Sequence, residues 1–81
     1  MVELVFYTRK NCSLCEPAWR RVMEVTAGRD VTVHKVDIDS DSELANKYGW
    51  DIPVVMINGR YHSSHRVIQK KLAEALDRLG A

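Results

Sequence analysis

The chain has 81 residues, which is enough for one domain with a small hydrophobic core. Hydrophobic residues make up 46% and charged residues 28%, as in folded globular domains and unlike disordered chains. Twelve Lys and Arg residues against eleven Asp and Glu residues leave a net charge of +1, so charge gives no reason to expect nucleic acid or a membrane as a partner. We expect a single domain over residues 1–81, and a monomer.

The chain contains two cysteines, Cys12 and Cys15. Two are too few for the disulfide scaffold of a small secreted domain, and a bridge between them would close only a short loop. No segment approaches the about 20 consecutive apolar residues that a membrane helix needs, and the first residues do not follow the pattern of a signal peptide. We therefore expect a cytoplasmic protein, in which thiols stay reduced unless they cycle.

The first half of the chain is predicted to form a strand, a helix and a second strand. Residues 2–8 are rich in β-branched and aromatic residues, which is typical of a buried strand. Apolar or small residues then recur at helical spacing over residues 12–27, and Gly28 is placed to end that helix. Residues 31–38 form the second predicted strand.

The second half is predicted to form a short helix, a hairpin and a last helix. Residues 40–43 match a capping box, which marks the start of a helix. Asn58-Gly59 is a strong signal for a two-residue hairpin turn. The predicted elements are a helix that ends at Tyr48, strands over residues 54–57 and 60–62, and a helix over residues 65–79.

This order of elements, βαβαββα, predicts an α/β fold. The first two strands are joined through a helix, so we expect them to be parallel with a right-handed crossover. A four-stranded mixed sheet with helices on both faces fits a chain of this length.

The two cysteines directly follow the first strand and open the predicted first helix. Near a βαβ pattern in a reducing compartment, this Cys-x-x-Cys motif indicates a redox-active dithiol. Unpaired N–H groups and the positive end of the helix dipole would stabilise a thiolate on Cys12, and Arg9 and Lys10 add positive charge nearby. We therefore predict that Cys12 is the nucleophile and that Cys15, one turn further on and facing the sheet, resolves the mixed disulfide.

Pro17 complicates the start of this helix. In a helix that begins at Cys12, Pro17 lacks the N–H group that would bond to the Ser13 carbonyl. Either the first turn is kinked, or the regular helix begins nearer Glu16.

Several segments together resemble the thioredoxin-fold family. They are the motif from Cys12 to Cys15 after a strand, Val36-Asp37-Ile38-Asp39, the stretch from Tyr48 to Val55, and Ile57-Asn58-Gly59. The similarity is closest to short glutaredoxin-like proteins, because Thr8-Arg9 and the stretch from Cys12 to Glu16 match their Thr-Arg-x-x-Cys-x-x-Cys-Glu pattern. The resemblance implies a thioredoxin-like fold and an oxidoreductase that reduces protein disulfides or glutathione mixed disulfides.

The resemblance also implies a substrate site. In the family, the proline before the third strand is cis and lies beside the active-site cysteines, which implies a cis Ile52–Pro53 bond here. The backbone of Ile52 would then be free to pair with an extended substrate, like a short added strand. Arg9 matches the positive residue that binds the glycyl carboxylate of glutathione in the family.

This sequence departs from the family pattern at several positions. By position, Ser63 and Ser64 replace two glycines of the family's glutathione site, and Arg66 stands near the position at which the family carries an acidic residue that receives the ammonium group of glutathione. These changes imply weaker or redirected glutathione binding, with Ser64 and Arg66 at the start of the last helix placed for an anionic group instead. Phe6 replaces the buried acid that thioredoxin carries in its first strand. We expect no bound cofactor, and glutathione is a candidate co-substrate.

A metal site is one alternative function. Cys12 and Cys15, together with His62 and His65, offer four ligands for zinc or an iron–sulfur cluster if the turn after the hairpin folds back over the cysteines. We expect no metal and interpret both histidines as solvated loop residues.

A non-catalytic adaptor that keeps the fold as a binding module is the other alternative. It would use exposed aromatic residues near the cysteines, for which Trp50 and Tyr7 are the candidates. We expect both of these side chains, and Trp19, to lie in or beside the core instead.

Overall fold

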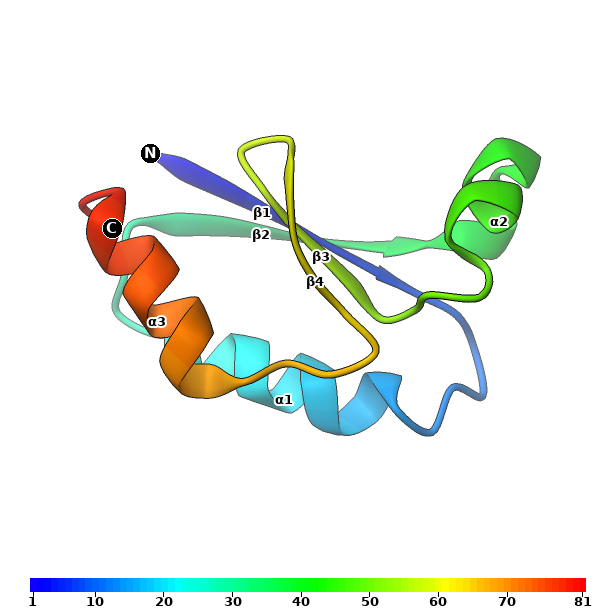
Figure 1. Cartoon of the computed structure of the whole chain (residues 1–81), viewed down its shortest axis with the longest axis horizontal. Helices are drawn as coiled ribbons and strands as arrows, with labels where there is room; N and C mark the ends of the chain where they lie inside the picture. The colour runs from blue at the N-terminus through cyan, green and yellow to red at the C-terminus, as the bar shows by residue number, and fades with distance from the viewer.

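The computed structural model describes all of residues 1–81 and confirms the predicted order of elements (Figure 1). The elements are β1 (Val2–Thr8), α1 (Cys15–Thr26), β2 (Val31–Asp37), the 3₁₀ helix η1 (Ile38–Ser40), α2 (Ser42–Tyr48), β3 (Val54–Ile57), β4 (Arg60–Ser64) and α3 (Gln69–Arg78). None of the helices is both long enough and apolar enough to cross a membrane.

The four strands form one mixed sheet in the order β2-β1-β3-β4. β1 and β2 are parallel, as the crossover through α1 requires, and β3 is antiparallel to both β1 and β4. Leu4 in the middle of β1 pairs with Val33 on one side and with Ile57 on the other. Asn58 and Gly59 have φ angles of 50° and 78°, which a tight hairpin turn needs. The predicted mixed sheet is confirmed.

The hydrophobic core lies between the sheet and the two longer helices, α1 and α3, which Figure 1 shows on the same side of the sheet. Alternate residues of β1 face this layer, so Leu4 and Phe6 are fully buried while Val5 between them is only partly covered. Val22 from α1 and Leu72 from α3 close the core from the helix side. This packing holds α1, and with it the cysteines, against the sheet.

The opposite face of the sheet is covered at only one end. Tyr7 of β1 points to this face, and its ring stacks on that of Tyr48 from α2 with 4.5 Å between the ring centres. α2 has no buried residue, and Val5 and Met56 stay partly exposed. Helices therefore lie on both faces, as predicted, but α2 covers much less of the sheet than α1 and α3 do.

The prediction that the first helix begins at Cys12 is wrong. The helix begins later because Pro17 lacks an N–H group and is tolerated in the first turn of a helix. With α1 beginning at Cys15, Pro17 lies in the first turn, where backbone N–H groups have no partner within the helix in any case. Cys12 lies in the preceding loop, and its carbonyl accepts a 3.1 Å hydrogen bond from the N–H of Cys15. The second alternative for Pro17, a regular helix that begins near Glu16, is confirmed.

The cap of α2 also differs from the prediction. Asp41, not Ser40, precedes the helix, and its Oδ1 accepts a 2.9 Å hydrogen bond from the N–H of Glu43. Ser40 belongs to η1 and donates its hydroxyl to the carbonyl of Asp37 at 2.6 Å. The serine that the capping-box pattern placed at the start of the helix therefore belongs to the 3₁₀ helix η1 instead, and β2 ends at Asp37.

β4 is longer and α3 shorter than predicted. Ser63 and Ser64 continue β4 in pairing with β3. α3 then begins at Gln69 rather than at His65, and Ile68 before it is extended, with φ −103° and ψ 111°. The prediction of a helix start beside Ser64 is therefore wrong. Ile68 fits the apolar stripe of α3 whether or not it is helical, so the pattern alone could not reveal the later start.

Candidate active site

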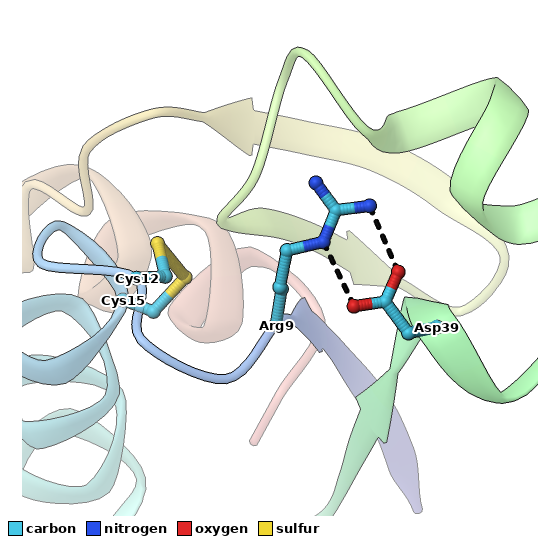
Figure 2. The surroundings of a disulfide bond; sticks show 4 residues. All are labelled: Arg9, Cys12, Cys15 and Asp39. Carbon is cyan, nitrogen blue, oxygen red and sulfur yellow. Dashed lines mark hydrogen bonds and ion pairs between the residues drawn. A yellow bond between two sulfur atoms is a disulfide. The ribbon is translucent and has the colours of Figure 1, made fainter.

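Cys12 and Cys15 form a disulfide just beyond the carboxyl end of β1 (Figure 2). Their Cα atoms are 5.2 Å apart. Asn11, directly before Cys12, has a φ angle of 59°, a left-handed conformation that Asn adopts more readily than most residues. This turn and the first turn of α1 bring the two cysteines together at the junction of strand and helix.

The two cysteines differ in exposure. Cys15 is 4% exposed and belongs to the core cluster, together with Phe6 and Ala18. Cys12 is partly exposed and lies at the edge of that cluster. Cys15 therefore faces the core, as predicted, and Cys12 is the cysteine that a second molecule can reach.

A hollow of about 540 Å³ opens beside the disulfide, between β1, β2 and α1. We call it the β2-side hollow. Both cysteines line it together with Trp19, and its charged residues are Arg9, Lys10, Glu16, Arg20, Lys35 and Asp37. Four cations against two carboxylates give this hollow an excess of positive charge, which favours a thiolate over a thiol.

Arg9 forms a two-point ion pair with Asp39 (Figure 2). Its Nε and Nη2 each donate a 2.9 Å hydrogen bond to one oxygen of the Asp39 carboxylate. These bonds hold the pKa of Asp39 below its ordinary value and raise the pKa of Arg9. Figure 2 shows that the guanidinium points away from the disulfide, so the predicted anion-binding residue already has an acidic partner.

Asp39 is not among the predicted site residues, although the sequence contains a signal for it. β1 and β2 are parallel neighbours, and Thr8 at the end of β1 pairs with Asp37 at the end of β2. Side chains that follow two such strands meet at the same edge of the sheet. The two acids at the end of β2 and just after it, Asp37 and Asp39, are therefore the natural partners for a cation that follows β1.

The Ile52–Pro53 bond is cis, as the resemblance predicted, and Pro53 is buried. Ile52 is only partly buried and packs against the core cluster. Its N–H and carbonyl make no hydrogen bond to another backbone group. The segment before β3 therefore has free backbone groups, as the predicted substrate role requires.

The loop between β4 and α3 folds back over this segment. His65 has a φ angle of 67°, and its N–H donates to the carbonyls of Pro53 at 2.9 Å and Asp51 at 3.2 Å. The imidazole Nε2 lies 3.1 Å from the carbonyl oxygen of Trp50. A second hollow of about 590 Å³, which we call the α3-side hollow, is lined by His65, Arg66 and Leu14 among others. Arg66 therefore lies in a hollow that also contains a residue of the Cys-x-x-Cys motif.

The two serines lie away from both hollows. Ser64 Oγ is 2.8 Å from the hydroxyl of Tyr61 and lines neither hollow. Ser63 Oγ is buried without a hydrogen-bond partner. The structure therefore brings Arg66, but not Ser64, into a hollow that Leu14 of the Cys-x-x-Cys motif also lines.

The two histidines do not join the cysteines in a ligand cluster. His62 lies in β4, within the predicted strand over residues 60–62, and burial lowers the pKa of its imidazole, so its interpretation as a solvated loop residue is wrong. His65 does fold back towards the active-site side but faces Trp50 and Asp51. No group of three or more His, Cys, Asp or Glu side chains is arranged to hold a metal ion.

The expectation for Trp50 is also wrong, because its side chain lies outside the core. Trp50 is 93% exposed in the turn between α2 and β3. Tyr7 and Trp19 are half-buried, as expected, and Trp19 packs against Phe6 with 5.2 Å between ring centres. The sequence could not distinguish an inward from an outward aromatic residue in a turn.

Comparison with known proteins places these features in a family. A family model described as a glutaredoxin-like domain (DUF836) matches residues 3–77, a range that contains Cys12, Cys15 and Pro53. The glutaredoxin-like protein YDR286C homolog of Dictyostelium discoideum is 31% identical over 77 residues, which cover 88% of this chain and 71% of that protein.

Solved structures share the fold. The structural-genomics target protein XcR50 of X. campestris matches with a TM-score of 0.77 and 30% identity, over 93% of this chain and 96% of that one. A mutant thioredoxin from Halobacterium salinarum NRC-1 matches with a TM-score of 0.72 and 21% identity, over 95% of this chain and 73% of that one. The expected thioredoxin-like fold is confirmed.

Proposed function

Because the chain belongs to the glutaredoxin-like (DUF836) family, we propose that it is a dithiol–disulfide oxidoreductase. Cys12 acts as the nucleophile and Cys15 as the resolving cysteine. The observation that supports this most is their unequal exposure, since Cys12 is accessible in a cationic hollow while Cys15 is 4% exposed. Such a pair presents one sulfur to a partner and keeps the other for the second step.

The proposed reaction is a two-electron reduction of a substrate disulfide by the reduced protein. The Cys12 thiolate attacks one substrate sulfur, forms a mixed disulfide and releases the other sulfur as a thiolate, which takes a proton from water. Cys15 loses its proton to solvent and attacks the sulfur of Cys12. This step forms the Cys12–Cys15 disulfide and releases the second substrate thiol. A reductant, either one dithiol or two monothiol molecules such as glutathione, then returns two electrons to the protein.

Two features favour the Cys12 thiolate in this proposal. The first turn of α1 begins three residues after Cys12 and carries N–H groups that lack helical partners. Lys10 and Arg20 line the same hollow as the cysteines. Arg9 contributes less, because Asp39 already balances its charge.

The segment before β3 is the proposed docking site for the substrate. Ile52 has a free backbone N–H and carbonyl, and Pro53 has no N–H to donate. An extended polypeptide can therefore pair with Ile52 like a short added strand. This arrangement suits a disulfide within a protein chain.

Glutathione is the candidate co-substrate, either in a mixed disulfide or as the reductant. Two of the three guanidinium nitrogens of Arg9 are bonded to Asp39, which weakens its attraction for the glycyl carboxylate. The charge of Arg66 repels the ammonium group at the other end of glutathione. We therefore propose that protein disulfides react faster than glutathione disulfide.

A non-catalytic adaptor is the second candidate function, and the exposure of Trp50 supports it. Trp50 is 93% exposed and stands two residues before Ile52. A large exposed aromatic side chain is typical of a binding surface. An adaptor would bind its partner here without using either thiol.

Trapping of a mixed disulfide tests the oxidoreductase proposal against the adaptor. The reduced Cys15→Ser variant, mixed with a disulfide-bonded peptide, should accumulate a covalent adduct on Cys12 that mass spectrometry detects. Cys12→Ser should give no adduct, and the unmodified protein should release free peptide thiols without a lasting adduct. Absence of the adduct in Cys15→Ser, together with unchanged peptide disulfide in the unmodified protein, would exclude the oxidoreductase.

A further inference from the structure

The α3-side hollow combines unpaired positive charge with an apolar rim. It lies between the start of α1 and the loop that leads into α3, and Arg21, Arg66, Leu14 and Ile68 line it. We propose that this hollow binds an acidic polypeptide segment next to the reacting cysteine of a protein substrate. The inference rests on the proposed oxidoreductase function and adds the class of substrate to it.

Arg21 is positioned by the first helix. Leu14, Pro17 and Arg21 are three and four positions apart, so they lie on one face of the start of α1. This face lines the hollow, and Arg21 is exposed on it. Leu14 stands between the two cysteines in the sequence, so a chain bound in this hollow contacts the Cys-x-x-Cys motif itself.

Arg66 is positioned by the hydrogen-bonded loop before α3. The N–H of His65 donates to the carbonyls of Asp51 and Pro53, and the N–H of Arg66 donates to the carbonyl of Ser64 at 2.7 Å. These bonds tie the loop to the segment that carries the free backbone groups of Ile52. A substrate that pairs with Ile52 therefore runs close to Arg66.

Neither arginine has an acidic partner. Arg9 and Arg29 form ion pairs with carboxylates, but Arg21 and Arg66 form none. No Asp or Glu lines the α3-side hollow, whereas Glu16 lines the β2-side hollow together with a second acid. In a chain whose net charge is only +1, this is a local excess of positive charge that a carboxylate from outside can balance.

The apolar rim indicates that the acidic partner is a polypeptide rather than a small anion. Leu14 is 52% exposed and Ile68 is 47% exposed, and both line the hollow. A small anion gains no binding free energy from these side chains, because it has no apolar surface to bury against them. A polypeptide segment covers them with its own apolar groups while its carboxylates reach the arginines.

The proposed interaction raises the rate at which the substrate docks, and it leaves the two thiol–disulfide exchange steps unchanged. Attraction between exposed charges speeds association at low salt and is screened at high salt. The preference for acidic substrates should therefore weaken as salt is added.

Disulfide-linked peptide dimers provide the test. Three synthetic dimers differ only at the two residues after the cysteine, which are both Asp, both Asn or both Lys. The reduced protein is mixed with each dimer in a single turnover, and thiol release gives a second-order rate constant. Each exposed charge pair is worth roughly threefold, so we expect the Asp dimer to react about tenfold faster than the Asn dimer at low salt. The Lys dimer should be the slowest.

Paired variants assign the preference to the two arginines. In Arg21→Gln/Arg66→Gln, the ratio of the Asp to the Asn rate constant should fall to about one. The matched control is Arg60→Gln/Arg78→Gln, which removes the same charge from exposed residues at the hairpin turn and in the last turn of α3. The control should keep the wild-type ratio.

The outcomes separate this inference from the proposed function. Equal rates for the Asp and Asn dimers, with both reduced through Cys12, would overturn the acidic-segment site and leave the oxidoreductase intact. An unchanged ratio in Arg21→Gln/Arg66→Gln would also overturn it. Failure to reduce any dimer would contradict the oxidoreductase and, with it, this inference.

Discussion

Arg9 and Asp39 form a two-point ion pair where the parallel strands β1 and β2 end (Figure 2). The pair connects the loop that leads to Cys12 with the segment that leads to α2. The pair also directs the Arg9 guanidinium away from the disulfide. Lys10 and Arg20, which form no ion pair, remain as cations that line the β2-side hollow together with the cysteines. Arg9, to which the resemblance assigned the binding of an anionic substrate, therefore also connects two segments that surround the site.

This ion pair predicts a loss of stability in acid. The hydrogen bonds from Arg9 lower the pKa of Asp39 from its ordinary value of about 3.8. A carboxylate whose pKa is lowered by folding stabilises the fold above its unfolded pKa, and this contribution disappears as the pH falls through the folded pKa. Asp39→Asn should therefore unfold at a lower urea concentration than the wild type near neutral pH, and the two midpoints should converge in acid.

Glu74→Gln is the matched control, because Glu74 is exposed and forms no ion pair. Its unfolding midpoint should stay close to that of the wild type throughout. A difference between Asp39→Asn and the wild type that persists unchanged in acid would argue against the pair.

The half-buried His62 predicts a second pH dependence, closer to neutral. Burial lowers the pKa of His62 from its ordinary value of 6.5. The unfolded chain therefore takes up a proton at a higher pH than the folded chain, and stability falls as the pH drops below about 6.5. His62→Gln should flatten this fall in urea unfolding midpoints, whereas replacement of the exposed His34 by Gln should not. Identical slopes for wild type and His62→Gln would contradict this assignment.

Two leucines of the C-terminal helix region test where the core ends. Leu72 is fully buried, whereas Leu79 is 49% exposed. Leu72→Ala should lower the free energy of unfolding by about 2–5 kcal/mol, because it removes apolar contacts and leaves a cavity. Leu79→Ala should cost about 1 kcal/mol or less. Equal losses for the two variants in urea unfolding would show that the core extends to the end of the chain.

Much of the fold could be predicted because local signals agree with the tertiary structure. The bounds of β1 (Val2–Thr8) and β3 (Val54–Ile57) match the prediction, since each run of β-branched residues ends at turn or polar residues. The resemblance supplied the cis bond at Pro53, which no local pattern could have revealed. Cys15 lies on the apolar face of the first helix whether that helix begins at Cys12 or at Cys15, so helical spacing predicts its place in the core in both cases.

The errors at Ser64, Asp39 and Trp50 concern residues whose role depends on parts of the structure far away in the sequence, unlike those at the starts of α1 and α2. Ser64 extends β4 because β3 lies beside it, and α3 starts later as a result. Asp39 becomes part of the site through Arg9, which a chain crossover brings next to it. The exposure of Trp50 depends on how the turn after α2 is oriented against the sheet. In each case the local pattern fits two structures, and packing selects one of them.

The most direct test of the central claim is the rate at which iodoacetamide alkylates the reduced protein as a function of pH. We predict that Cys12 reacts first, with a midpoint well below the about 8.5 of an ordinary thiol, and that Cys15 reacts only after denaturation. Mass spectrometry of the digested protein identifies the modified residue at each time point. A midpoint near 8.5 for Cys12, or faster alkylation of Cys15, would contradict the account.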